Sequence, residues 1–440
     1  MKRIFLTNVR IVDGDGNPAI EDGCLVVSAP EKVEEDSSIL YVGSKAECQL
    51  VPQPEEQVVD GTGYTLMPGM FNVHVHLRAT SPRYQFKCDP YGTPYRTLIY
   101  LRHHMEALLK GVTCIRGCGD SHGIDVAIRK ALGKKMLWGP RLVTCGKAIL
   151  PHGGHANHQL GSLECSGEAQ FMEAVRSQIN DGVDQIKLFY SGGASDAAGA
   201  NMFTAHITDE EGAAACKVAH MHHKKVAAHL SNDVAIQSAI RVGVDSLEHC
   251  YYMNDETVQM LVDNDRWLVP TLTVTDANHS DPAWLGAISP FVVQRLRDVH
   301  QIHVESIAKV IAKRGAEKIC TGTDTLPTDL FDDTPATTYE CEMLVEAGLT
   351  PLQALQAATG NSADLCEIAD KTGRLKVGLS ADILAIKGKP DQNIRDLRNL
   401  SMVMRDGRIV FSKLESYQQP LQFLPPEWLE CDTMGTRVPW

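Results

Sequence analysis

Short apolar runs alternate with amphipathic stretches through the middle of the chain. One apolar run ends at His74, and further runs lie at residues 113–115, 141–144, 185–189, 226–228, 246–247, 267–271 and 318–321. The stretches between them carry apolar residues at helical spacing, most clearly at residues 167–180, 208–224 and 291–314. Strands that alternate with helices are typical of parallel sheets, and eight such units match a (β/α)8 or TIM barrel. We therefore predict an α/β fold in which residues 67–367 form this barrel.

Both ends of the chain show a different pattern, in which short strands are separated by turns. Strand-like runs lie at residues 4–12, 24–27 and 39–43, and again at residues 381–386 and 403–410. Turn residues such as those at 13–18 separate these runs. Because the same pattern flanks a helix-rich middle, we predict a small β-sandwich domain built from residues 1–66 and 368–415. Residues 416–440 lack periodicity, and we predict a C-terminal tail that packs on the body or on a partner subunit.

The composition narrows the function classes. A chain of 440 residues is long enough for a barrel and a smaller module. Its net charge of −13, without a basic stripe, disfavours nucleic acid and anionic membranes as partners. No stretch suits a membrane span, and polar residues interrupt the N-terminal apolar run too early for a secretion signal. The 13 cysteines have no regular spacing, so we expect mostly free thiols and a cytoplasmic protein.

Candidate metal ligands stand at the ends of the predicted strands. His74 and His76 are two residues apart, so in a strand they point to the same face and can share a metal ion. Four further candidates lie in or just after later apolar runs: Lys187, His229, His249 and Asp324. A lone histidine on an apolar strand is more often packed in a core than bound to a metal. A barrel, however, brings the C-terminal ends of its strands to one mouth, so the set of six favours a metal site.

Several motifs resemble those of the amidohydrolase superfamily of metal-dependent hydrolases, over essentially the whole chain. They are Met67-Pro68-Gly69 before His74-Val75-His76, Gly139-Pro140-Arg141, Gly153-Gly154-His155, Ile186-Lys187, Ala228-His229, Leu247-Glu248-His249, Gly322-Thr323-Asp324 and the closing residues 378–383. Within the superfamily, the chain resembles the branch of Xaa-Pro dipeptidases (prolidases), carboxypeptidase-like dipeptidases and the ochratoxin-hydrolysing amidase. The same branch implies a small-molecule amide substrate and a homo-oligomer.

The resemblance implies two divalent metal ions, with zinc expected. His74, His76 and Asp324 would hold one ion, and His229 and His249 the other. Lys187 would carry an N6-carboxyl group and bridge both ions. A free ammonium has no lone pair to offer a cation, whereas a carbamate has two anionic oxygens. Imidazole and carboxylate groups also suit zinc.

The resemblance also implies a mechanism for cleavage of an amide bond. A hydroxide that bridges the metal ions would attack the carbonyl carbon. Asp324 would accept the proton of the water and pass it to the leaving amine. His155 is the candidate for a second catalytic residue, either as an oxyanion donor or as a contact to a substrate carboxylate. Tyr190 and Tyr251 are further candidates for substrate contacts, and aromatic residues within 78–98 could line or cover an apolar pocket.

Other histidines and cysteines receive an ordinary structural interpretation. His103 and His104 lie on a predicted helix, as do three histidines between 220 and 223, and we expect all of them at the surface. Cys114 and Cys118 have the spacing of half a metal site, but no second pair follows, so we expect them to pack in the core.

Three functions compete. The first is a two-metal amide hydrolase that acts on a dipeptide or N-acyl amino acid, such as an Xaa-Pro or an ochratoxin-like amide, or alternatively on an aryl amide, a carbamate or a urea. The second is a one-metal deaminase of the same superfamily. Those enzymes tend to lack the lysine of the fourth strand and to carry a glutamate soon after the histidine of the fifth, whereas here Lys187 is present and Leu230-Ser231-Asn232 follows His229. The third is a binding protein that has lost catalysis, but such a protein would lack ligands.

Overall fold

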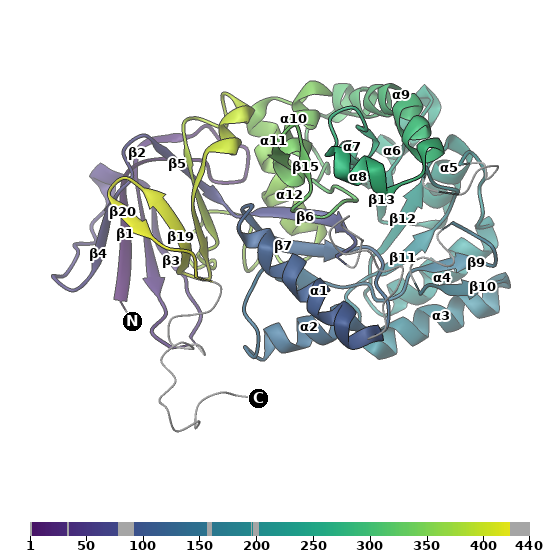
Figure 1. The fold of residues 1–440 in the computed structure, drawn as a ribbon, viewed down its shortest axis with the longest axis horizontal. Coiled ribbons are helices and arrows are strands. Elements are labelled where there is room, and N and C mark those ends of the chain that lie inside the picture. The colour runs from purple at the N-terminus through teal and green to yellow at the C-terminus, as the bar shows by residue number, and fades with distance from the viewer. Residues whose placement is uncertain are drawn as a thin grey trace.

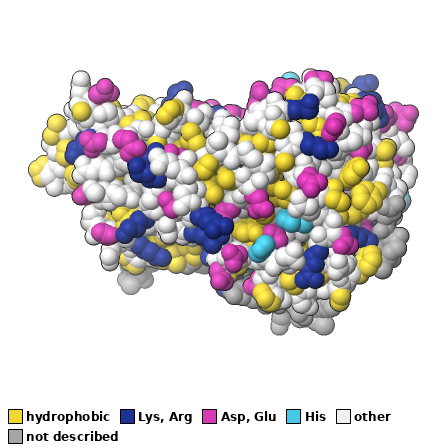
Figure 2. All heavy atoms as spheres, turned by 90° about the horizontal axis from the view of Figure 1, so that it is seen from above, with side chains coloured by type: hydrophobic (Ala, Val, Ile, Leu, Met, Phe, Trp, Pro, Cys, Tyr) yellow, Lys and Arg dark blue, Asp and Glu magenta, His cyan; other side chains and the backbone are white. Residues whose placement is uncertain are grey.

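The structure is a computed structural model, and it describes residues 2–32, 35–77, 92–155, 161–194, 196 and 202–422. Figure 1 shows two lobes side by side, one built mainly of strands and the other of strands surrounded by helices. The strand-rich lobe combines the first and last parts of the described chain, which are drawn in purple and yellow. Figure 2 shows acidic and basic side chains interspersed on the face that it draws.

Strands from both ends of the chain form one sheet in the smaller lobe. These strands are β1 Lys2–Ile11, β2 Ile20–Ala29, β3 Ile39–Ser44, β4 Gln57–Asp60, β5 Tyr64–Pro68, β17 Ile383–Lys387, β18 Leu400–Arg405, β19 Arg408–Leu414 and β20 Tyr417–Gln419. Their order is β20-β19-β18-β17-β5-β1-β2-β3, and β4 also pairs with β1. The two chain ends meet where β17 pairs antiparallel with β5. Side chains from both ends, such as Leu6 and Met402, pack in one buried cluster.

The larger lobe contains parallel strands in two sheets. Their members are β6 Met70–Val75, β7 Val112–Gly117 and β8 Arg141–Val143, followed by β9 Ile149–Pro151, β10 Leu163–Cys165, β11 Ile186–Phe189, β12 Val226–Leu230, β13 Ser246–His249 and β14 Trp267–Val269. Backbone hydrogen bonds also connect the two sheets, directly on one side and through residues 318–321 on the other. Gln185 N donates to Thr144 O at 3.1 Å, Leu268 N to Lys318 O at 2.9 Å, and Val73 N to Thr321 O at 2.8 Å. The mixed α/β fold is thus confirmed, whereas closure into one barrel stays a prediction that these bonds support.

Helices follow the parallel strands and cover them (Figure 1). They are α1 Gly92–Leu108, α2 Ile124–Gly133, α3 Gly167–Asp181, α4 Asp209–Met221, α5 Asp233–Val242, α6 Asp255–Asp263, α7 Leu272–Thr275, α8 Pro282–Ala287, α9 Pro290–Arg314, α10 Ala336–Glu346, α11 Pro351–Ala358 and α12 Gly360–Leu365. Two short 3-10 helices span Lys45–Glu47 and Ile394–Asn399, and a small hairpin joins β15 Leu330–Phe331 to β16 Thr334–Pro335. None of the helices in the described ranges is long and apolar enough to span a membrane.

Local signals explain where the predicted helices begin and end. Helix α4 begins after Thr208, whose side chain forms a capping box with Glu211. Helix α9 begins after Ser289, which caps Val292 N and is followed by a proline at the first helical position. The prediction for 208–224 ran too far, because His223 adopts a left-handed φ of 55° that ends the helix.

One burial prediction is wrong. His103 and His104 on α1 are 1% and 0% exposed rather than at the surface. They belong to a buried stripe with Tyr100 and Ala107, at the spacing of one helical face. His103 Nδ1 also lies 2.9 Å from Leu77 O, so its polar ring is satisfied within the core. Cys114 and Cys118 are buried as expected, and the cysteines within the described ranges are free thiols.

Candidate metal centre

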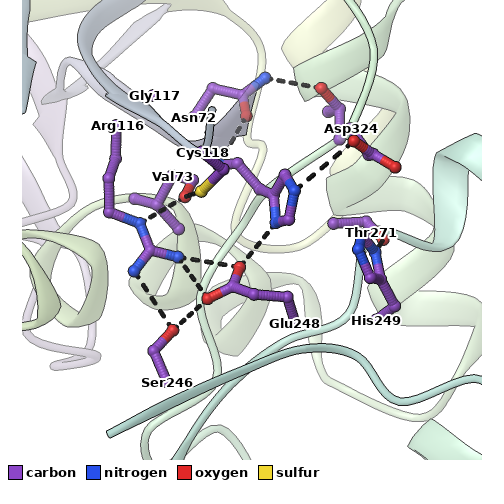
Figure 3. Close-up of polar contacts among 12 residues, drawn as sticks. Asn72, Val73, Arg116, Gly117, Cys118, Ser246, Glu248, His249, Thr271 and Asp324 are labelled. Carbon is purple, nitrogen blue, oxygen red and sulfur yellow. Dashed lines mark hydrogen bonds and ion pairs between the residues drawn. The ribbon is translucent and has the colours of Figure 1, made fainter. Parts of the chain in front are cut away.

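The predicted ligands converge at the C-terminal ends of the parallel strands. His74 and His76 lie at and just after the end of β6, and both present Nε2 to the same carboxylate oxygen of Asp324, at 3.5 and 3.1 Å. Figure 3 shows Asp324 facing an imidazole ring from one side, with His249 close by. Asp324 adopts a left-handed φ of 55°, and its backbone N–H donates to His74 O at 2.8 Å. This turn fixes the carboxylate against the two imidazoles.

The remaining histidines extend this group into a row of rings. The centroid of His249 is 4.7 Å from that of His74 and 4.5 Å from that of His229. His229 in turn stacks on His155, with centroids 4.5 Å apart and an interplanar angle of 26°. His74, His249 and Asp324 bring their ligating atoms within 4.8 Å of one another, which is close enough to hold one ion. Residues from the ends of β6, β12 and β13 and from the segment after Cys320 therefore meet at a single centre.

Hydrogen bonds at the second ring nitrogen select the atom that each histidine can offer to a metal. His74 Nδ1 donates to Glu248 Oε2 at 2.6 Å, and His76 Nδ1 donates to Gly119 O at 3.1 Å. His249 Nδ1 lies 2.7 Å from the Thr271 hydroxyl. Carboxylate and carbonyl oxygens only accept, so Nδ1 of His74 and of His76 carries the proton and Nε2 keeps its lone pair, and the Thr271 hydroxyl can accept from His249 in the same way. Such outer hydrogen bonds orient metal-bound histidines in proteins.

His229 has the opposite arrangement. Its Nε2 lies 3.3 Å from Gly192 O and 3.3 Å from Ser231 Oγ, so this nitrogen carries the proton. The atom that remains for a ligand is Nδ1. The sequence could not predict this difference, because it depends on the loop after β11 that supplies the Gly192 carbonyl.

Burial keeps the histidine rings neutral. The pKa of His74 falls to about 4, mainly because burial penalises the charged ring and because the Lys187 charge is near. The same cause, together with neighbouring rings, holds the pKa of His229 and of His249 well below the usual range. Burial acts to raise the pKa of Asp324, but the adjacent His76 ring and the nearby charge of Lys187 hold that pKa below its usual value. Neutral imidazoles beside an ionised carboxylate are the protonation states that metal ligation requires.

Lys187 is the clearest sign that this centre holds a further group. Its side chain on β11 is 0% exposed, and its Nζ has no hydrogen-bond partner among the described residues. His74 Nε2 is likewise buried without a partner in the described part of the chain. The ring centroid of Phe189 lies 5.4 Å from Lys187 Nζ. A buried, unpaired ammonium is costly, so this donor set fits a centre that binds divalent metal ions better than it fits a free amine.

Glu248 and Arg116 lie beneath the ligands and were not among the predicted site residues. Arg116 Nη2 donates to Glu248 Oε1 at 2.7 Å and to Oε2 at 2.9 Å, and both side chains are at most 1% exposed (Figure 3). Although burial opposes both ions, the charge of Arg116 holds the pKa of Glu248 far below its usual range. Strand alternation would put neighbours such as Glu248 and His249 on opposite faces. Both point inward because His249 adopts a left-handed φ of 67°.

Cys118 comes close to His74 and Glu248, but this second group of three is a poor metal site. Burial raises the pKa of the Cys118 thiol to about 12, so the thiol stays protonated. The carboxylate of Glu248 is already occupied by Arg116 and His74. The group that contains Asp324 is therefore the candidate metal centre.

The predicted substrate contacts fall in different places. His155 Nδ1 donates to Asp196 Oδ1 at 2.5 Å, and Gly193 N donates to the other oxygen of Asp196 at 2.8 Å. Tyr251 lies at the centre, with its ring stacked on His249 at 5.3 Å. Tyr190 does not join them, because its hydroxyl lies 3.1 Å from Ser238 Oγ on α5, within the outer helical layer. Residues 78–91 of the predicted pocket segment, and residues 423–440 of the predicted tail, lie outside the described residues.

Comparisons with known proteins identify a family and several similar chains. The family model described as the amidohydrolase family matches residues 65–410. Ochratoxinase of Aspergillus niger is 28% identical over 419 residues, which cover 88% of this chain and 81% of ochratoxinase. A candidate prolidase from Bifidobacterium longum has a similar structure, with a TM-score of 0.75, 26% identity and coverage of 96% of both chains. A Xaa-Pro dipeptidase with bound methionine in its active site has a TM-score of 0.80 at 24% identity, over 95% of this chain and 100% of that one.

Proposed function

The chain belongs to the amidohydrolase family and is a hydrolase that acts on carbon–nitrogen bonds, and from this premise we propose that it is a two-metal amide hydrolase. The observation that carries the proposal is the buried Nζ of Lys187, which lacks a partner among the described residues beside a row of neutral histidines. A one-metal site would leave this ammonium unexplained. Hydrogen bonds that connect the two parallel sheets, on one side through residues 318–321, support a closed (β/α)8 barrel as the scaffold.

The donor set supports the following assignment. His74, His76 and Asp324 would hold one divalent ion, and His229 and His249 would hold the other. Lys187 would bridge them after carboxylation at Nζ. Zinc is the expected ion, because imidazole and carboxylate ligands suit it. When bound, the ions supply a nucleophilic water at neutral pH and polarise the amide carbonyl.

The residues of the chain would orient the substrate and move its proton. Asp324 is held ionised and faces the same space as the Nε2 atoms of His74 and His76, so it can accept a proton and return it to the leaving nitrogen. His155 is oriented through Nδ1 by Asp196, and its Nε2 would donate to a substrate oxygen in the imidazolium form of the ring. Tyr251 would contribute an apolar ring face beside His249.

For the substrate, we propose a dipeptide or N-acyl amino acid. Ochratoxinase, a candidate prolidase and a Xaa-Pro dipeptidase are all similar to this chain over most of its length. The substrate class would therefore include an Xaa-Pro or an ochratoxin-like amide. Aryl amides, carbamates and ureas form the alternative class.

The test is a hydrolysis screen of the zinc-loaded protein. The substrates are Xaa-Pro, Xaa-aromatic and Xaa-basic dipeptides, N-acyl amino acids, aryl amides, carbamates and ureas. An Asp324→Asn variant serves as the inactive control, because it keeps the shape of the side chain but loses the proton acceptor. We expect turnover of at least one dipeptide or N-acyl amino acid that the variant loses. If the metal-loaded protein turns over none of these compounds, the amide-hydrolase proposal fails.

A further inference from the structure

A second cavity lies at the opposite end of the parallel strands from the metal centre. Its volume is about 710 Å³. It is lined by residues at the N-terminal ends of β8, β11 and β12, by the segment after α12, and by the turn between β18 and β19. Arg116 and Gln185 also line it, and they are hydrogen-bonded to each other. On its other side, Arg116 donates to Glu248 beneath the metal ligands. A layer of paired side chains therefore separates this cavity from the metal ligands.

The lining of the cavity is basic, although the chain as a whole is acidic. Nine Lys or Arg residues and four Asp or Glu residues line it, in a chain whose net charge is −13. Basic groups gathered in a hollow reinforce one another, because the low-dielectric walls focus their field. Such a hollow attracts anions even when the net charge of the protein repels them.

Several of these cations share a carboxylate or lie at the limit of ion-pair distance from one. Arg141 and Arg405 share Asp382, at 3.1 and 3.0 Å. Lys225 Nζ donates to two backbone carbonyl oxygens, at 3.2 and 3.0 Å, and its nearest carboxylate, that of Glu367, is 3.7 Å away. With Asp382 and Glu248 added to the four lining carboxylates, six anions face nine cations, so the wall keeps a formal excess of three positive charges.

The same cavity offers a neutral donor without an acceptor. Trp138 lines it, and the buried indole Nε1 has no hydrogen-bond partner among the described residues. Indole N–H can only donate, so the complementary ligand carries an acceptor oxygen. From this donor and the excess of positive charge, we propose that the cavity binds a compact polyanion through phosphate or carboxylate groups. Lys224 and Lys371 supply flexible ammonium groups to it.

The experiment follows Trp138 fluorescence in the zinc-loaded, full-length protein during titration. Inorganic phosphate and succinate are the two probes, and they distinguish a phosphate ligand from a carboxylate ligand. Ionic strength is held constant with sodium chloride, because screening alone changes exposed charges. A Trp138→Phe variant identifies the part of the signal that comes from the cavity.

The decisive variant is the double substitution Lys224→Ala and Lys371→Ala. Its matched control is Lys217→Ala, which removes an exposed lysine of α4 outside the cavity. We expect saturable binding of at least one probe, weakened roughly tenfold or more in the double variant and unchanged in the control. If the probe instead binds at the metal centre, its affinity will be the same in the double variant as in the native protein. That result would overturn the proposal. So would the absence of saturable binding of either probe up to about 10 mM. Neither the fluorescence signal nor the binding affinity depends on turnover. A negative result would therefore not count against the proposed hydrolase activity.

Discussion

Replacement of Glu248 by glutamine tests whether the buried layer beneath the ligands supports the metal centre. Glu248 accepts from Arg116 at 2.7 and 2.9 Å and from His74 Nδ1 at 2.6 Å, and it is 0% exposed. The variant keeps the size of the side chain but removes the charge. Arg116 then becomes a buried cation without an anion, and loss of one member of such a pair costs about 3 to 5 kcal/mol. Because the glutamine oxygen still accepts one bond, we expect a loss of about 3 kcal/mol in the free energy of unfolding.

The same substitution also acts on the metal. Glutamine holds the Nδ1–H of His74 less firmly than a carboxylate does, and loss of such a partner lowers metal affinity roughly 10- to 100-fold. Urea denaturation of the metal-free protein measures the first effect, and competition with a zinc chelator measures the second. Glu106→Gln is the control, since Glu106 pairs with the exposed Arg102 on α1 and its loss is expected to cost little. Unchanged stability and zinc affinity in Glu248→Gln would refute the reasoning.

Three further variants test the surroundings of the centre. Asp196→Asn weakens the bond that holds His155 Nδ1 at 2.5 Å. We expect kcat to fall roughly 10- to 100-fold with little change in KM. A proportional rise in KM would argue against a role of Asp196 in positioning His155. Gly193→Ala puts a Cβ 2.2 Å from the His155 ring. We expect kcat to fall by about the same factor as in Asp196→Asn, while the circular dichroism spectrum stays unchanged. Burial raises the pKa of Glu340 from 4.5 to about 7, so the folded state holds this proton longer than the unfolded state and loses stability as pH rises between those values. Glu340→Gln removes this loss of stability. Its free energy of unfolding, relative to that of the native protein, should rise by up to about 3 kcal/mol between pH 4.5 and pH 8. If urea denaturation shows a difference that does not depend on pH, the raised pKa of Glu340 is contradicted.

The sequence predicts those features that depend on regular periodicity. His74 and His76 share a face because strand residues alternate, and the apolar runs before Lys187 and His229 form strands β11 and β12. The composite sheet likewise follows from the similar patterns at both ends of the chain. In each case a repeating backbone geometry determines where the side chain points.

The remaining features depend on irregular backbone or on distant partners. The left-handed φ of His249 turns two adjacent residues inward, so alternation alone could not assign Glu248 to the interior. The contact between His155 and Asp196 joins two loops that are 41 residues apart. Tyr190 illustrates the opposite error, because it follows a strand that carries a ligand but its hydroxyl lies against α5. Proximity in sequence was not enough to place any of these side chains.

The most direct test of the two-metal account is the metal content of the purified protein and of a Lys187→Ala variant, measured by elemental analysis after zinc loading. Carboxylated Lys187 would bridge both ions, so its removal takes a ligand from each of them. We expect two zinc ions per chain in the native protein and a clear loss of metal in the variant. One ion per chain in the native protein, still bound after Lys187→Ala, would contradict the account.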